Sequence, residues 1–448
     1  MISEKPFRHF FLVLILIPGL RQAHATEGME HANTPAVSSP HPAAGKHETL
    51  EEKAHAHVKN GVFSQYAKEW YGLAFYGYGN ASYDYNFNSP STGINNLRGF
   101  DVGSNAIRLH LAQFVLERNA RVQGSWLDRI GARVKFNIGS DSRSVGGTNV
   151  GNDADFQEWY LQYIAPIGNG VNIQFGRINS LVGFEVVESP YNLNYSRSLL
   201  FNLGQPFTTV GARLTYQFND YVTLSAAAIN SIDSLTTTST RHPKVESAVT
   251  FTPHDSIRVA LYGLYGFVDG ASGTPGGIRI LGGGYIHMEP VPQVELALEA
   301  YYGNQSNSSS LSPDRNARWN GVAGYATYEF TPDWSVRMRA ELFEDAGGFV
   351  SCSGVAGPPK SNVCFGATSN TSAPPIAQTI WETTATLQFQ PLPFLMTRLE
   401  LRYDKSNKHV FQVGGKTTLA CSTQTLFCPV ANIEKTSQYE LQIDNSYL

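Results

Sequence analysis

The residues best suited to chemistry gather in one short stretch, VESPYNLNYSRS, at positions 187–198. It holds Glu188, Ser196, Arg197 and Ser198 in a chain of 448 residues, of which only 16% are charged. A serine beside a general base could act as a nucleophile in hydrolysis. An acid, an amide and an arginine could equally contact polar solutes in a channel. The stretch therefore predicts either an active site or the lining of a passage.

A hydrolytic site needs partners that the sequence does not place beside these serines. A serine nucleophile requires a base within hydrogen-bond reach, and no histidine lies near Ser196 or Ser198 along the chain. G-x-S-x-G, H-E-x-x-H and Walker motifs are absent. His110 and His287 have no serine or cysteine neighbour in sequence, which favours polar residues facing a lumen. We expect no catalytic residues, no cofactor and no metal site, and a hydrolase is the weakest alternative.

The elements that would position this stretch alternate between apolar and polar residues. In SVRMRAELF, Val336 and Met338 face one way, whereas Arg337, Arg339 and Glu341 face the other. This period of two predicts a strand with two different faces, and about ten residues is the length of a tilted membrane-spanning strand. Sixteen such segments are expected, approximately at 70–83, 105–117, 130–139, 154–165, 171–178, 207–218, 221–231, 243–252, 257–267, 278–288, 293–304, 318–330, 335–344, 378–389, 395–404 and 436–448.

The connections between these segments alternate in length. One kind is short, as in TYQFNDYVTL and YEFTPDWSVRM, often with an aromatic residue just before a Pro or Asn-Asp turn. The other kind is long and rich in Gly, Ser, Asn and Thr. Short turns at one end and long loops at the other are typical of transmembrane barrels, with aromatics at the interfaces. An open sheet edge in hydrocarbon would leave backbone groups unpaired, so the sheet must close.

We therefore predict an all-β fold, a closed antiparallel transmembrane β-barrel of about sixteen strands. Its short turns would be periplasmic and its long loops extracellular. An even number of strands places both chain termini on the periplasmic side. A sixteen-stranded barrel is wide enough for an aqueous lumen.

Alternation also assigns the charged residues that face the lumen. The basic ones are Arg108, Arg133, Lys135, Arg213, Lys244, Arg258, Arg279, Arg337, Arg339, Arg398 and Arg402. The acidic ones are Glu246, Glu295, Glu299, Glu329, Glu341, Glu382, Glu400 and Asp404. This mixed wall has a small positive excess and predicts a weak preference for anions. Alternatively, many of these charges only pair with one another across strands.

The opening stretch falls within residues 179–206, a loop on the extracellular side. A loop of this length in a compact fold is usually functional or disordered. Its apolar residues, such as Phe184, Leu199 and Phe201, argue against disorder. We expect the loop to fold into the barrel mouth and to constrict the pore. The residues expected at this constriction are Glu185, Glu188, Asn192, Tyr195, Arg197 and the neighbouring strand residue Arg213.

The N-terminus resembles a secretory signal peptide over residues 1–25. Lys5 and Arg8 precede an apolar run at 10–20, and Ala-His-Ala at 23–25 is a small-x-small cleavage site. The run is too short for a spanning helix, which needs about 20 residues.

Residues 26–68 have the composition of a flexible periplasmic linker, and 69–448 would form the barrel. The linker is rich in His, Ala and Pro and poor in large apolar groups that could offset the entropy of ordering. Its histidines could capture metal ions, but a solvated tether is the simpler interpretation.

The four cysteines form two close pairs flanking loop-like sequence. No CxxC motif occurs, which argues against a zinc site. In an exported chain, locally paired cysteines favour disulfides. We expect Cys352 to pair with Cys364 and Cys421 with Cys428.

The region around the opening stretch resembles the OmpL-like family of outer-membrane β-barrel porins. The resemblance is carried by FGRINSLVGFEVVESPYNLNYSRSLLFNLGQPFTTVGARLTYQFND and the preceding DFQEWYLQYIAPIGNGVNIQFG. The matching positions are Gly176, Gly183, Glu185, Pro190, Asn192, Tyr195, Ser196, Arg197, Ser198, Phe201, Pro206, Phe207, Thr208, Gly211 and Arg213. Arg177 stands where a lysine is common, and Thr209 where a histidine is expected. The resemblance implies a porin-type barrel in a Gram-negative outer membrane, without a defined substrate.

The sequence thus predicts a diffusion porin for small hydrophilic solutes or ions, embedded in outer-membrane lipid. The formal net charge of −4 offers no basic surplus for nucleic acid. Porins often trimerise, so a homotrimer is compatible with this prediction. The main alternative is a surface adhesin or structural barrel with a plugged lumen.

Overall fold

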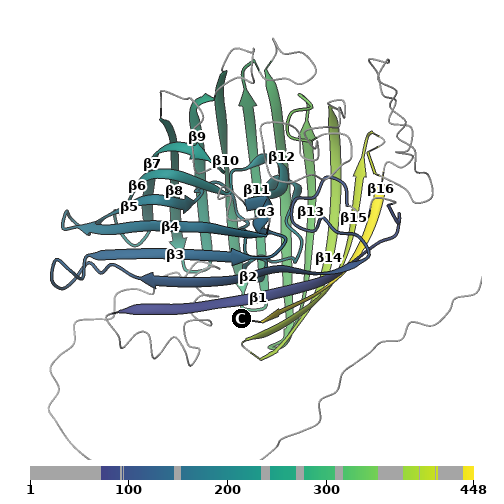
Figure 1. The fold of residues 1–448 in the computed structure, drawn as a ribbon, viewed down its shortest axis with the longest axis horizontal. Coiled ribbons are helices and arrows are strands. Elements are labelled where there is room, and N and C mark those ends of the chain that lie inside the picture. Colours follow the sequence, from purple (N-terminus) through teal and green to yellow (C-terminus); the bar gives the residue numbers. More distant parts are fainter. Residues whose placement is uncertain are drawn as a thin grey trace, which may run out of the picture. The chain divides into compact units, whose positions relative to one another are not determined.

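Sixteen antiparallel strands close into one barrel in a computed structural model of the chain (Figure 1). The structure describes residues 72–90, 93, 95–145, 153–233, 243–268, 277–307, 316–351, 377–392, 394–408, 410–411 and 437–447. The signal peptide, the linker and all four cysteines lie outside the described residues, so those predictions stay predictions. Among the described residues, no helix has the length and apolar character needed to cross a membrane.

Each strand pairs with its neighbours in sequence, and β1 pairs with β16 to complete the ring. The strands are β1 (Leu73–Asn86), β2 (Ala106–Arg118), β3 (Ile130–Ile138), β4 (Ala154–Ala165), β5 (Val171–Asn179), β6 (Thr208–Gln217), β7 (Val222–Ile232), β8 (Lys244–His254), β9 (Ile257–Val268), β10 (Gly277–Val291), β11 (Val294–Gln305), β12 (Ala317–Thr331), β13 (Trp334–Asp345), β14 (Gln378–Leu392), β15 (Leu395–Ser406) and β16 (Ser437–Tyr447). The predicted all-β antiparallel barrel and its strand number are therefore confirmed.

The two faces of the wall follow from the alternation in each strand. In β13, Val336, Met338 and Leu342 are exposed on the outside, whereas Arg339 and Glu341 are buried on the inside. Apolar side chains thus cover the outer face, as a hydrocarbon environment requires.

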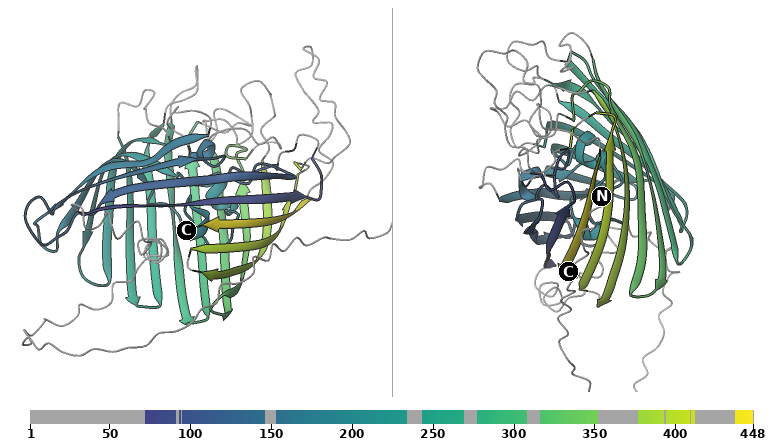
Figure 2. Two further views of the ribbon diagram at one scale, coloured as in Figure 1. Left: turned by 60° about the horizontal axis from the view of Figure 1, so that its bottom comes forward. Right: turned by 90° about the vertical axis from the view of Figure 1, so that its right-hand side faces the viewer.

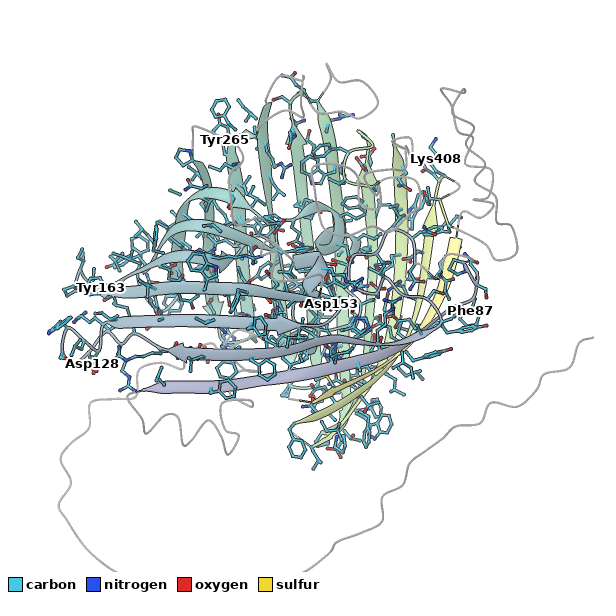
Figure 3. All side chains as sticks on the ribbon, viewed as in Figure 1. Phe87, Asp128, Asp153, Tyr163, Tyr265 and Lys408 are labelled. Atoms are coloured by element: carbon cyan, nitrogen blue, oxygen red, sulfur yellow. The ribbon has the colours of Figure 1, made fainter. Side chains whose placement is uncertain are left out.

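Aromatic rings stack where strands meet short turns, as with Trp334 and Phe389, whose ring centroids are 4.3 Å apart. Figure 3 shows Asp128 and Tyr163 at one end of the strands β2–β4, and Phe87 beyond the other end of β1.

The first strand begins and ends three residues later than the sequence predicts. Pairing with β2 runs from Leu73 opposite Arg118 to Asp84 opposite Ala106. The alternation continues through Tyr85 and Asn86. The segment between β1 and β2 therefore starts at residue 87 and not at residue 84.

Three segments enter the barrel from the long-loop end. The inner loop (residues 180–207) joins β5 to β6 and contains two short helices, η1 (Ser189–Tyr191) and η2 (Leu200–Gly204). Residues 87–105 join β1 to β2, and the short helix α3 (Ser142–Val145) follows β3. In the views of Figure 2, the blue strands of the first half face the green strands of the second half.

The hydrophobic core lies inside the barrel because the inner loop packs on an apolar part of the wall. Loop residues Leu193, Leu199, Leu200 and Leu203 belong to this cluster. The wall contributes Ala227, Ile229, Tyr262, Leu264, Leu281, Ala297, Tyr301, Ala317, Trp319, Ala323, Tyr325, Phe343 and Ile380. Full burial of one such leucine contributes about 1.5–3 kcal/mol. A second cluster joins the three entering segments through Phe100, Val145, Val187, Phe201 and Phe207.

Candidate pore constriction

Carboxylates of the wall accept hydrogen bonds from the backbone of the inner loop. Glu400 on β15 accepts from the Tyr195 N–H at 2.8 Å and the Ser196 N–H at 3.1 Å. Both oxygens of Glu341 on β13 lie within 2.8 Å of the Leu199 nitrogen. Buried backbone N–H groups need such acceptors. These acids therefore hold the loop backbone in place.

The same arrangement recurs on the strands β8 and β11. Glu246 accepts from the Leu181 N–H at 3.0 Å, and Glu299 accepts from the Phe184 N–H at 3.1 Å. In the ring of sixteen strands, β8 and β15 are seven places apart. Lys135 on β3, which binds Glu188 of the same loop, lies opposite β11, so the inner loop spans the lumen.

Arginines of the wall donate to carbonyls of the same loop. Arg398 donates to Ser189 at 2.9 Å, to Asn192 at 3.0 Å and, more weakly, to Pro190 at 3.4 Å. Arg337 donates to the Leu193 carbonyl at 3.1 Å. The wall thus supplies both donors and acceptors to a segment that has no ladder of its own.

Arg339 connects the predicted constriction residue Glu185 and the nearby loop residue Ser196 to the wall. It forms ion pairs with Glu185 of the loop at 3.1 Å and with Glu382 on β14 at 3.0 Å. It also donates to the Ser196 carbonyl and to its hydroxyl at 2.9 Å. All four side chains are buried.

Glu188, the acid of the opening stretch, is 0% exposed and lies against β2–β4. Its Oε1 accepts from Lys135 Nζ at 2.7 Å, Gln113 Nε2 at 3.1 Å and Gln157 Nε2 at 3.0 Å. Glu188 therefore anchors one side of the loop to the wall.

Arg197 pairs with neither Glu185 nor Glu188. It donates to Asp141 at 3.2 Å and lies over the ring of Phe100, 4.5 Å from its centroid. Burial lowers the pKa of Arg197, but Asp141 outweighs this effect, so its pKa is raised above the usual value. The guanidinium links the inner loop to the other two entering segments.

The other predicted constriction residues have local partners. Asn192 exchanges two hydrogen bonds with the Val186 backbone, at 2.9 and 2.8 Å. The ring of Tyr195 meets His110 edge to face at 5.6 Å. Arg213 on β6 donates to the Asn179 carbonyl at 2.6 Å.

The charged lining divides into a covered set and a set that keeps solvent exposure. The covered basic residues are Lys135, Arg213, Lys244, Arg339, Arg398 and Arg402, and the covered acidic ones are Glu246, Glu299, Glu341, Glu382, Glu400 and Asp404. Arg108, Arg133, Arg258, Arg279 and Arg337 keep part of their exposure, as do Glu295 and Glu329. Among the predicted lining residues, exposed arginines therefore outnumber exposed acids.

Comparison with known proteins agrees with this geometry. The sequence profile of the family described as "Putative beta-barrel porin-2, OmpL-like" matches residues 72–432. The chain belongs to the OmpL-like porin family. It is therefore an outer-membrane porin, as the sequence resemblance implies. A comparison with curated proteins finds no match.

Solved structures share the fold of this porin. OprB of Pseudomonas putida is 12% identical with a TM-score of 0.51, over 87% of this chain and 97% of that chain. The outer membrane channel DcaP of Acinetobacter baumannii is 11% identical with a TM-score of 0.50, over 84% and 97%. OmpF of Salmonella typhi, in complex with daunomycin, is 11% identical with a TM-score of 0.50, over 84% and 98%. At such identities the similarity concerns the fold alone.

Sequence reasoning missed two residues of the porin that brace its interior, Arg98 and Asp101. Arg98 donates to the Arg197 carbonyl at 3.1 Å and pairs with Asp404. Asp101 accepts from Arg402 and from other wall groups. Arg98 and Asp101 are the only charged residues in segment 87–105. Two charges in an otherwise uncharged loop could have indicated that they pair with the wall.

A serine, a histidine and an aspartate form a hydrogen-bonded chain inside this porin. Ser82 Oγ lies 2.7 Å from His110 Nε2, and His110 Nδ1 lies 2.9 Å from Asp141. However, Ser82 donates its hydroxyl proton to Asp84 at 2.8 Å. A serine whose proton is directed at a carboxylate is not arranged to pass that proton to a histidine base. The arrangement is suited to bracing the wall.

The two serines of the opening stretch have other partners. Ser196 Oγ accepts from Arg339, and Ser198 Oγ accepts from the Phe201 N–H at 3.0 Å. Among the described hydrogen bonds, neither involves a histidine.

Proposed function

We propose that this barrel lets small hydrophilic solutes diffuse through an aqueous pore that the inner loop constricts. The observation that carries the proposal is the attachment of this loop to strands on opposite sides of the lumen, at Lys135 on β3 and Glu299 on β11, and at Glu246 on β8 and Glu400 on β15. A polar segment anchored across a wide barrel narrows it without closing the wall. The constriction residues proposed from sequence lie on or beside this loop.

We propose a weak preference for anions. The support is the partial exposure of five inward arginines against two inward glutamates. Charged side chains that line a pore favour ions of opposite sign. The covered charges pair with one another or with the loop, so they contribute little to this field.

We also propose that the protein has no enzymatic activity and that both chain termini are periplasmic. The pairing of Leu395 with Tyr447 supports this orientation, because it places the end of β16 beside the short turn that precedes β15. Long segments leave the opposite end of the barrel. Proteolysis of intact cells and of spheroplasts, read with a C-terminal epitope, tests the orientation.

Two disulfides and the removal of a signal peptide are part of the same proposal. Export would place Cys352, Cys364, Cys421 and Cys428 in an oxidising compartment. Peptide mapping of the mature protein without reduction reveals both pairings and the new N-terminus. Crossed pairings or free thiols would contradict the proposed connectivity.

A homotrimer is proposed from the outer face of β7–β10. Four small residues lie side by side across these strands, in the register Ala226, Ser247, Gly263, Gly282. A Cβ added at Gly282 would meet nothing within 4 Å, so packing within one barrel does not require this glycine. A flat surface of this kind allows two barrels to approach closely.

The second candidate function is a plugged barrel that anchors surface loops. It is favoured by the buried apolar cluster that the inner loop forms with the wall. Liposome swelling separates the two candidates. The diffusion pore predicts swelling in small sugars that declines as sugar size grows, whereas the plugged barrel predicts none from a correctly folded, heat-modifiable protein.

A further inference from the structure

The inner face of β1 differs from the rest of the lumen wall. Its four central positions, Tyr78, Asn80, Ser82 and Asp84, are polar and buried. None of these four side chains forms a described hydrogen bond to the inner loop. Ser82 bonds only to Asp84 and His110, which are also wall residues.

Several other strands form side-chain hydrogen bonds to the loop. Inner side chains that bond to it lie on β3 (Lys135), β8 (Glu246), β11 (Glu299), β13 (Glu341) and β15 (Glu400). Other strands, among them β7, β9 and β10, also lack a described side-chain hydrogen bond to the loop, but their residues Ala227, Tyr262 and Leu281 pack in the apolar cluster. On β1, a buried polar face has no such bond.

Several buried polar groups on the inner face of β1 lack hydrogen-bond partners among the described residues. Both amide atoms of Asn80, the Tyr78 hydroxyl and one oxygen of Asp84 are buried without a hydrogen bond. Leaving such a group unsatisfied costs about 1–3 kcal/mol. Asn80 alone, which is 2% exposed, leaves a donor and an acceptor unpaired.

The loop presents unpaired atoms to the same region. Glu188 Oε2 and Arg197 Nε are buried without partners, and both groups lie within electrostatic range of Tyr78. Tyr191 of the loop lies beside Tyr78, with ring centroids 6.2 Å apart. We call Tyr78, Asn80, Ser82, Asp84, Glu188 and Arg197 the β1 seam.

The side of the loop that packs on β11 and β12 is apolar, so water is not expected to enter there. There Leu199, Leu200 and Leu203 pack in the apolar cluster. Tyr301 and Trp319 reinforce this contact by donating to loop carbonyls, at 2.8 and 3.1 Å. Water entering this side would separate apolar surfaces, whereas water entering the β1 seam would satisfy polar groups.

We propose that the solute path opens along the β1 seam, between β1 and the inner loop, with Asn80 at its narrow part. The seam is sealed in this conformation, so the loop separates from β1 while it stays packed on the strands β11 and β12. The seam offers both donors and acceptors, so it suits hydrated solutes that carry both kinds of group. This inference rests on the proposed diffusion pore.

Cysteine labelling tests the path. Asn80→Cys places a thiol in the seam, and Ala323→Cys places one on the inner face of β12, within the apolar cluster. Each folded, heat-modifiable variant is treated in liposomes with a charged methanethiosulfonate reagent, and labelling is followed by peptide mass spectrometry. The unsubstituted chain gives the background of its own four cysteines. We expect rapid labelling at position 80 and no labelling above background at position 323.

Two results would overturn the proposal. One is labelling at 323 as fast as at 80, and the other is protection of both positions in a protein that conducts. Labelling is measured independently of conductance. A folded barrel that is labelled at position 80 but conducts no ions would therefore contradict the proposed diffusion pore, but not the water access along the β1 seam. As a second variant, Asn80→Asp should shift the reversal potential toward cations, whereas an unchanged potential would place the path elsewhere.

Discussion

At the scale of single residues, charge inside this barrel mainly attaches one part of the chain to another. Arg398 donates to loop carbonyls, and Glu341 and Glu400 accept from loop amides. A buried charge is tolerated only where such partners exist. Part of the charged lining inferred from alternation thus holds the inner loop in place.

Replacing Arg398 by methionine should loosen the loop. Arg398→Met keeps the volume of the side chain but removes the donors to Ser189 and Asn192. We expect a loss of about 1–3 kcal/mol in loop docking, because buried carbonyls are left unpaired. Single-channel recording should show added current noise, and the mobility shift on heating should occur at lower temperature. Lys405→Gln, on the outer face of β15, is the matched control and should change neither quantity.

Docking of segment 87–105 should persist in mild acid. Burial raises the pKa of Asp101, but Arg402 and Arg98 lower it further, so its pKa lies below the usual value for aspartate, about 3.9. A carboxylate with a lowered pKa stabilises the fold above its unfolded pKa, and this stability is lost only as pH falls through the folded pKa.

Limited proteolysis between pH 7 and pH 5 should therefore give the same rate of cleavage within 87–105. Asp101→Asn should raise that rate at every pH in this window. A rate for the unsubstituted protein that rises steeply between these pH values would contradict the assignment.

At the scale of elements, the strands could be predicted closely and the contacts of the inner loop could not. Strand alternation is a local property, so a run such as Ala154–Ala165 is visible in the sequence itself. The inward course of the loop was also predictable, because Leu199 and Phe201 need burial. Its attachments join residues far apart, such as Tyr195 with Glu400, and no local pattern encodes such pairs. Ser82 and Asp141 reach His110 for the same reason.

The small-residue row on β7–β10 gives a prediction at this scale. Gly282→Phe adds a large side chain on the outer face, where nothing within the barrel obstructs it. The barrel should fold normally but lose the trimer in detergent, as measured by light scattering and cross-linking. Ile280→Phe enlarges an exposed residue of the same strand and should have the smaller effect. A Gly282→Phe protein that remains trimeric would rule out this face as the interface.

At the scale of the whole molecule, the barrel combines an apolar exterior with a lumen that one loop spans. The partly exposed arginines, among them Arg133, Arg258 and Arg337, determine the remaining field. We expect a reversal potential in a salt gradient that indicates weak anion preference. Arg258→Gln should reduce this preference, and Lys405→Gln should not. A clear cation preference in the unsubstituted protein would show that acids dominate the path.

The most direct test of the account compares single-channel conductance with and without the inner loop. A variant in which a short Gly-Ser linker replaces residues 186–199 is recorded beside the unsubstituted protein in the same planar bilayer. A third protein, with a Gly-Ser linker in the exposed turn at 119–126, controls for chain replacement. The account predicts stepwise conductance for all three and a several-fold larger step for the variant that lacks the loop. Equal steps in all three proteins, or no conductance from a folded barrel of any of them, would contradict it.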